Sequence, residues 1–348
     1  MHEGAVLSNP LDYNHEPLED GEPEHLSALH KCYDYIADNG SESFETEHQN
    51  DPPPDDTRLE TQLSWLSVSE CSGDLERRQV PATTTRIVRG VDVRKTELHD
   101  VTLATDALVR HRIVDYGVRS HGTSETTVEQ AEALILEALH KLVTEWDESP
   151  LTDENGIVHD VDLVLIDKGW IGNWTEDGEV KTWASQPVET FCMAAGLDHY
   201  LPAKGAPNYQ PPAPDRRVII GDNWHINRGR GKHRVCDEVI WNADHWHLLV
   251  EELFLQPEDS KDRFELFIPS DGIWTNHKAL GQHIEAGAKQ LREQMSRGTR
   301  SRRPRFVRDH WWDSLAMALV AKSILSQRVE RQARQKPRRT LAQMAAGK

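Results

Sequence analysis

The chain has 348 residues, 37% of them hydrophobic and 28% charged, with a formal net charge of −18. This length allows one large domain or two smaller ones. There is no run of about 18 apolar residues, so no membrane-spanning helix is expected, and the four cysteines contain no CxxC pair that would indicate a zinc site.

The charge is distributed unevenly along the chain. Residues 1–80 hold 19 Asp and Glu against 4 Lys and Arg, whereas residues 288–348 hold 16 Lys and Arg against 4 Asp and Glu. A basic segment of this kind attracts phosphate backbones, but it is equally typical of a solubilising terminus. Composition alone leaves both interpretations open.

The first 80 residues are predicted to be an acidic and largely irregular segment. The stretch "HLSALHKCYDYIADNG" has apolar residues at helical spacing and ends in Asn39-Gly40, so one helix is expected there. The following "NDPPPDD" breaks any helix and is typical of a linker.

The compact part is predicted to begin near Arg86 with three strands. "RIVRGVDVRK", "ELHDVTLATDA" and "LVRHRIVDYGVR" have tight connections between them and indicate an antiparallel meander. The next segment, "TTVEQAEALILEALHKLVTEW", places its apolar residues on one helical face. "DVDLVLIDKGW" then contains a continuous apolar run, which is typical of a strand covered on both faces.

The second half continues to alternate helices and strands. We expect a short helix in "VETFCMAAG", a strand in "YLPAKG", a long loop over residues 206–231, a helix in "NADHWHLLVEELFL", a strand in "RFELFIPS", and helices in "HKALGQHIEAGAKQLREQM" and "DHWWDSLAMALVAKSILSQ". This order predicts an α/β fold of the ribonuclease H-like type, a mixed sheet flanked by helices.

Three acidic residues stand at positions that suit a metal site. Asp92 lies between two valines in a strand, Asp167 ends the "LVLI" strand, and Asp313 lies in the last helix. Grouped carboxylates repel one another unless a cation lies between them, and oxygen ligands suit Mg²⁺ or Mn²⁺. Taken singly, an Asp at a strand end is more often a cap or a turn former. Asp309 stands one helical turn before Asp313. It would act either as a second ligand or as the N-cap of the last helix.

An ordered set of motifs resembles the nuclease part of a phage terminase large subunit of the lambda-like type. The motifs are "LERRQVPATTTRIVRGVDV", "IVDYGV", "LIDKGW", "LPAKG", "NADHWHLLVEELFL", "FIPSDG" and "DHWWDSLAMALVA", within about residues 70–325. The upstream "FETEHQNDP" resembles the segment that joins the ATPase of that family to its nuclease. No GxxxxGK[ST] motif occurs, so the ATPase is missing, and a split gene, a truncated gene and a fragment all fit.

The resemblance implies a domain organisation and a set of metal ligands. Residues 1–80 would be the junction between ATPase and nuclease, residues 81–327 the nuclease domain, and residues 328–348 a basic tail. The catalytic, metal-binding acids would be Asp92, Asp167 and Asp313, with Asp309 or His310 as a further ligand. Two Mg²⁺ or Mn²⁺ ions would be bound.

The resemblance also implies a substrate and partners. The chain would cut double-stranded DNA during viral genome packaging in the host cell cytoplasm, together with a small terminase subunit, a portal and a separate packaging ATPase. The residues expected to contact DNA phosphates are Lys168, Lys204, Arg302, Arg303, Arg305 and Arg308.

Two other functions remain open at this point. A transposase or junction resolvase of the same fold would use the same three acids, and a non-catalytic packaging adaptor would only bind DNA or the portal. His245 and His247 are two positions apart in a helix and do not share a face, so packing or surface exposure is expected rather than a zinc pair.

Overall fold

The computed structural model describes residues 63–106, 110–169, 186–207, 209–228, 236–269, 277–296 and 309–334, all in a unit that begins at Leu63. Its elements, in chain order, are α4 (Trp65–Ser69), β1 (Gln79–Val80), β2 (Thr84–Val93), β3 (Glu97–Asp106), β4 (His111–Ser120), α5 (Val128–Glu148), β5 (Leu151–Asp153), β6 (Val158–His159), β7 (Leu163–Asp167), α6 (Pro187–Ala195), β8 (Tyr200–Ala206), β9 (Val218–Gly221), β10 (Trp224–Asn227), β11 (Glu238–Asn242), α7 (Ala243–Leu255), β12 (Phe264–Leu266), α8 (Lys278–Ser296) and α9 (His310–Arg334).

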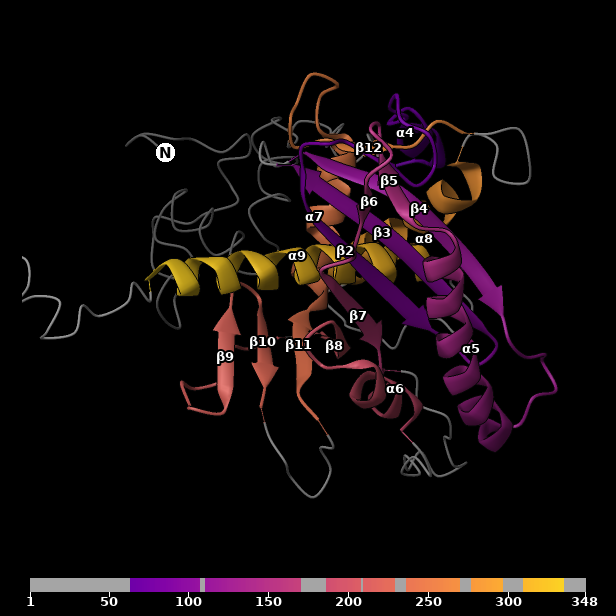
Figure 1. The fold of residues 1–348 in the computed structure, drawn as a ribbon, viewed down its shortest axis with the longest axis vertical. Helices are drawn as coiled ribbons and strands as arrows, with labels where there is room; N and C mark the ends of the chain where they lie inside the picture. Colours follow the sequence, from indigo (N-terminus) through magenta and orange to yellow (C-terminus); the bar gives the residue numbers. More distant parts are fainter. Residues whose placement is uncertain are drawn as a thin grey trace, which may run out of the picture. The chain divides into compact units, whose positions relative to one another are not determined.

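A large mixed sheet organises this unit (Figure 1). Among the described residues its strand order is β12-β4-β3-β2-β7-β8-β11-β10-β9. Strands β2, β3 and β4 form the expected antiparallel meander, and β7 and β8 then add parallel to β2. The central order β4-β3-β2-β7-β8, with β3 running against its neighbours, is the ribonuclease H-like arrangement. The predicted fold class is therefore confirmed.

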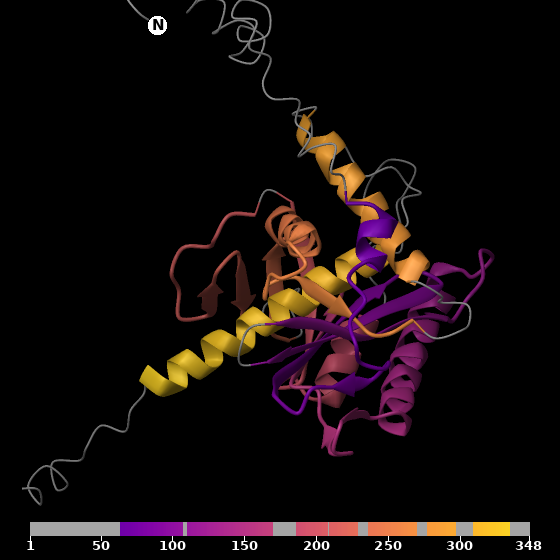
Figure 2. The same cartoon turned by 90° about the horizontal axis from the view of Figure 1, so that it is seen from above.

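Helices cover both faces of the sheet, and Figure 2 shows α9 and α5 on opposite sides of it. Val91, Val93 and Leu98 pack with residues of α5 and α6 on one face. On the other face Val88, Val101 and Leu103 pack with the long apolar stretch of α9 and with α7 and α8. Burial on both faces explains the continuous apolar run in β7.

Several elements differ from the expectation. Residues 206–231, predicted to be one long loop, contain strands β9 and β10, and β11 immediately precedes α7. Residues 63–80, assigned to the linker, contain α4 and β1, and the backbone N–H of Trp65 donates to Glu285 of α8 at 2.8 Å. Helix α9 extends to Arg334, into the segment predicted to be a basic tail.

Two further expectations concern membrane-spanning helices and residues that the structure does not describe. None of the helices in the described part of the chain is both long and apolar enough to cross a membrane. The helix predicted before Asn39-Gly40 lies outside the described residues, as do Arg302, Arg303, Arg305 and Arg308.

Candidate active site

The buried carboxylate of Asp92 faces the first turns of α9. The alternation along β2 points Val88, Gly90 and Asp92 toward α9, and Asp92 is only 1% exposed. Its backbone N–H donates to the Ser314 hydroxyl of α9 at 3.2 Å. The β strand and the helix therefore bring Asp92 and the start of α9 together from opposite ends of the chain.

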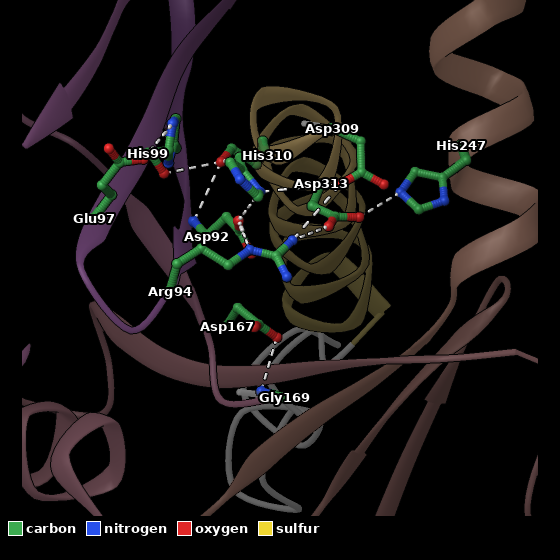
Figure 3. A network of polar contacts seen from close by, with 11 residues as sticks. Asp92, Arg94, Glu97, His99, Asp167, Gly169, His247, Asp309, His310 and Asp313 are labelled. Carbon is green, nitrogen blue, oxygen red and sulfur yellow. Dashed lines mark hydrogen bonds and ion pairs between the residues drawn. The ribbon is translucent and has the colours of Figure 1, made fainter. Parts of the chain in front are cut away.

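Arg94 lies among the acids (Figure 3). Its Nε atom lies 2.7 Å from Asp92 Oδ2, and its Nη2 atom lies 3.0 Å from Asp313 Oδ2 and 3.8 Å from Asp309 Oδ1. Burial alone would lower the pKa of Arg94, but the carboxylates of Asp92, Asp313 and Asp309 outweigh it and raise the pKa. One guanidinium thus neutralises a group of carboxylates that would otherwise repel one another.

Two histidines also contact these acids. His247 of α7 donates through Nε2 to Asp313 Oδ1 at 2.9 Å, since a carboxylate only accepts. The Nδ1 atom of His310 lies 3.2 Å from Asp92 Oδ2, which makes an ion pair when the imidazole is protonated. The ring of His99 lies 4.5 Å from that of His310, centroid to centroid.

Asp167 ends β7, directly beside β2 in the sheet. The backbone N–H of Gly169 donates to its Oδ1 atom at 2.9 Å. Burial, and then the negative charge of Asp92, raise the pKa of Asp167 to about 7, although Arg94 opposes the shift. This carboxylate therefore holds a proton more readily than an isolated aspartic acid does.

The acids open onto one cavity of about 470 Å³. Asp92, Asp167, Asp309 and Asp313 line it together with Arg94, Lys204, His247, Trp241, Gln290 and Trp312. The structure therefore brings the three predicted acids and Asp309 to one place. That place is the carboxyl end of parallel strands, where open α/β sheets bind their ligands.

The two lysines predicted to contact DNA lie differently. Lys204 is exposed in β8 and lines the cavity. Lys168 instead lies between two carboxylates, with Nζ 2.9 Å from Glu189 Oε1 and 2.5 Å from Glu238 Oε2. Only Lys204 offers its charge to a ligand in this arrangement.

The donors at the cavity suit a divalent cation by their chemistry. Carboxylate oxygens match the preferences of Mg²⁺ and Mn²⁺, and the raised pKa of Asp167 indicates a need for positive charge. In the described parts of the chain, no three His, Cys, Asp or Glu side chains stand close enough to hold a metal. Arg94 lies between Asp92 and Asp313, and its guanidinium occupies the space between their carboxylates.

Arg94 and His247 are site residues that the sequence analysis did not identify. Arg94 had a usable signal: it follows the last residue of β2 and stands two residues after Asp92, a spacing that keeps a side chain on the same face of a strand. His247 had no such signal in the sequence, because its contact with Asp313 depends on the packing of α7 against α9.

Comparisons with known proteins give distant likenesses. No protein-family model and no curated protein matches this chain. A Thermus thermophilus RuvC structure is 9% identical, with a TM-score of 0.29, over 69% of this chain and 96% of that one. T. thermophilus RuvC in complex with a Holliday junction substrate is 12% identical, with a TM-score of 0.23, over 34% of this chain and 65% of that one.

A structural study of the Aquifex aeolicus PPX-GPPA enzyme gives another likeness, 14% identical with a TM-score of 0.21, over 51% of this chain and 58% of that one. All three lie below the similarity at which a neighbour's activity transfers to this chain. The fold follows from the strand order in the sheet, which is that of ribonuclease H-like proteins.

Proposed function

We propose that the chain is a Mg²⁺- or Mn²⁺-dependent endonuclease that hydrolyses DNA phosphodiester bonds. The observation that carries this proposal is the convergence of Asp92, Asp167 and Asp313 on one cavity, from two neighbouring strands and the first turn of α9. Such a set of acids has little use in packing, because grouped buried carboxylates repel one another and require compensating positive charge.

The residues around the cavity have distinct parts in this reaction. Asp92, Asp167 and Asp313, with Asp309 or His310, would hold the cation, which supplies Lewis acidity toward the phosphate and a more acidic water. His247 fixes the orientation of the Asp313 carboxylate through its 2.9 Å hydrogen bond. Lys204, exposed on the cavity wall, offers a positive charge to a phosphate oxygen.

We further propose that this nuclease acts in viral genome packaging, as the nuclease part of a terminase large subunit does. The support is the order of the terminase-like motifs in the sequence, which fall on β2, β4, β7, β8, α7 and α9. The partners would be a small terminase subunit, a portal and a separate packaging ATPase. The arginines Arg302, Arg303, Arg305 and Arg308 directly precede α9 in the sequence and would contact the backbone of double-stranded DNA.

The first test is the cutting of supercoiled plasmid by the purified chain in Mg²⁺ or Mn²⁺. We expect nicking and then linearisation, and we expect Asp92→Asn and Asp313→Asn each to lower the rate at least about a hundredfold, because each removes a cation ligand while preserving shape. Asp259→Asn is the matched control, since Asp259 is exposed and does not line the cavity.

The outcomes separate the candidate functions. Cutting that disappears with EDTA and with both site variants, but persists in the control, supports the nuclease. DNA binding without cutting by the intact chain contradicts it and favours the adaptor. A strong preference for a four-way junction over linear duplex would support a resolvase and contradict the packaging role.

A further inference from the structure

A second cavity, of about 250 Å³, lies beside the C-terminal half of α9, where Figure 1 shows β9 and β10. Among the described residues, none lines both this second cavity and the cavity of the acids. Asp313 in the active site and Ile324 in the second cavity are about three turns of α9 apart, or roughly 16 Å along the helix. The second cavity is therefore a separate feature of the molecule.

The interior of the second cavity is apolar. Its walls include Leu201, Ile219, Trp224, Ile226 and Ile324. The indole N–H of Trp224 already donates to the Ser323 hydroxyl at 2.9 Å, so it needs no partner from a ligand. The volume is below that of most pockets that enclose a whole small molecule. The interior therefore suits one or two apolar side chains of a larger partner.

Two arginines line the second cavity on its solvent side. Arg228, directly after β10, has a side chain that is 58% exposed, and its Nε atom lies 3.8 Å from Asp237 Oδ2. Arg328 of α9 donates through Nη1 to the backbone carbonyl of Asp198 at 3.4 Å, and it forms no ion pair with another described residue. Neither guanidinium is engaged by a carboxylate at close range.

The positive charges at this place lie close to one another. Burial lowers the pKa of Arg328, the Asp198 carboxylate opposes that effect, and the charge of Arg228 lowers the pKa further. A third arginine, Arg217, directly precedes β9, and its backbone carbonyl accepts the N–H of Arg228 at 2.6 Å. Like charges opposite each other on antiparallel strands are destabilising. An anionic partner would relieve this repulsion.

The lining of the second cavity distinguishes between two kinds of anionic partner. A guanidinium binds a carboxylate through two parallel hydrogen bonds, and an acidic peptide can present an apolar side chain beside its carboxylates. A phosphodiester backbone has no apolar side chain for the interior. Its charge at every nucleotide would also be repelled by Asp198 and Asp237, which line the cavity as well. The combination therefore favours a peptide.

From this arrangement we propose that the second cavity is a docking site for an acidic segment of a partner protein. One apolar side chain of that segment enters the interior, and neighbouring carboxylates bind Arg228 and Arg328. The proposal goes beyond the nuclease function and does not depend on it, because the docking site shares no described residue with the cavity of the acids.

The test begins with a display library of random peptides of about twelve residues, selected on the full chain. We expect the selected peptides to carry an apolar residue flanked by Asp or Glu. Fluorescence polarisation of synthetic copies then gives their Kd values. The double variant Arg228→Gln, Arg328→Gln should weaken binding at least about tenfold, because it removes two charge-assisted contacts. Arg216→Gln is the matched control, since Arg216 is exposed and does not line the second cavity.

The apolar interior is tested from both partners. Replacing the apolar residue of a selected peptide by Ser should weaken binding about tenfold, because that side chain would no longer be buried. Ile219→Trp should weaken the parent peptide similarly, since the larger side chain of this half-buried residue fills the cavity. The arginine variant should keep its Tm within about 2 °C, because neither arginine is in a close ion pair.

The outcomes that overturn the proposal are distinct from a failure of the nuclease. Selection of no acidic peptide with an apolar residue would overturn it, as would selected peptides that bind the double arginine variant as tightly as the parent protein. Binding of a DNA duplex in EDTA is measured alongside. If the double variant weakens duplex binding and no such peptide is selected, the arginines serve DNA and the docking proposal is wrong. Absence of plasmid cutting alters none of these readings.

Discussion

Arg94 holds the place between Asp92 and Asp313 that the proposed function assigns to a cation. Its side chain is 34% exposed while that of Asp92 is 2% exposed, so the guanidinium is much more open to solvent than the carboxylate. A bound divalent ion and Arg94 would compete for the same oxygens. The residue therefore stabilises the acids when no ion is bound and opposes binding of the ion.

We accordingly expect Arg94→Ala to raise the affinity for Mn²⁺ about tenfold. The substitution should also lower the unfolding free energy of the metal-free protein by about 1–3 kcal/mol, a range that is reduced because Arg94 is partly exposed. Saturating Mn²⁺ should remove most of that loss, because the ion replaces the missing charge. Isothermal titration calorimetry and thermal unfolding measure both effects. Arg86→Ala serves as the control, because Arg86 lies in β2, its Nη1 donates to the Thr85 carbonyl, and it does not line the cavity. Weaker Mn²⁺ binding by Arg94→Ala would contradict the competition.

The acids of the site could be predicted from sequence because each has a local signal. Asp92 is a carboxylate between valines in a strand, and Asp167 ends an apolar run. The contact between Arg94 and Asp313 joins residues 219 positions apart. No local pattern specifies such a pair, since it depends on how α9 packs across β2.

At the scale of elements, the site depends on how closely α9 crosses β2. A Cβ atom at Gly90 would overlap the backbone carbonyl of Ser314, so only glycine permits this approach. Gly90 lies two residues before Asp92 on the same face of the strand, and Ser314 follows Asp313. The close crossing thus fixes the distance between two of the acids.

Gly90→Ala should consequently lower the unfolding free energy by about 3 kcal/mol, because the atoms that oppose the new methyl group are backbone and cannot move aside. It should also reduce cutting, since α9 must shift and carries Asp313 with it. Gly156→Ala is the control: its new methyl group meets open space, and only its φ of 77° costs about 1 kcal/mol. Urea unfolding and plasmid nicking test the pair, and equal losses in both variants would show that the crossing is not tight.

The elements that were predicted correctly from the sequence are those whose own apolar residues form a clear helix or strand pattern. The meander β2-β3-β4, the buried strand β7 and the helices α5 and α9 each carry an apolar pattern over many residues. Strands β9 and β10 have four residues each and lie in a segment rich in Pro, Gly and Arg. Strand β10 pairs with β11, and β9 pairs with β10. This pairing makes them strands, so the segment alone indicated a loop.

At the scale of the whole molecule, ionisable groups are buried on both sides of the sheet. Asp100 and Arg119 pair on one side, and burial, opposed chiefly by Arg119, raises the pKa of Asp100 to about 6. On another strand, burial and the nearby Lys322 lower the pKa of His111 to about 3. The two shifts have opposite consequences. Asp100 favours the fold at low pH and loses that contribution as the pH rises through 6, whereas His111 favours it at high pH.

The contribution of His111 can be isolated by substitution. Its imidazole stays neutral in the fold but titrates near 6.5 when unfolded, so the unfolded chain binds more protons between pH 6.5 and 3 and stability falls as the pH is lowered through that window. From pH 7 to pH 5 this amounts to about 2 kcal/mol. His111→Gln, whose amide oxygen can still accept from Lys322, should remove that part of the acid sensitivity. Urea unfolding at pH 7 and pH 5 measures the difference, and an identical loss in the variant would mean that His111 is protonated within the fold.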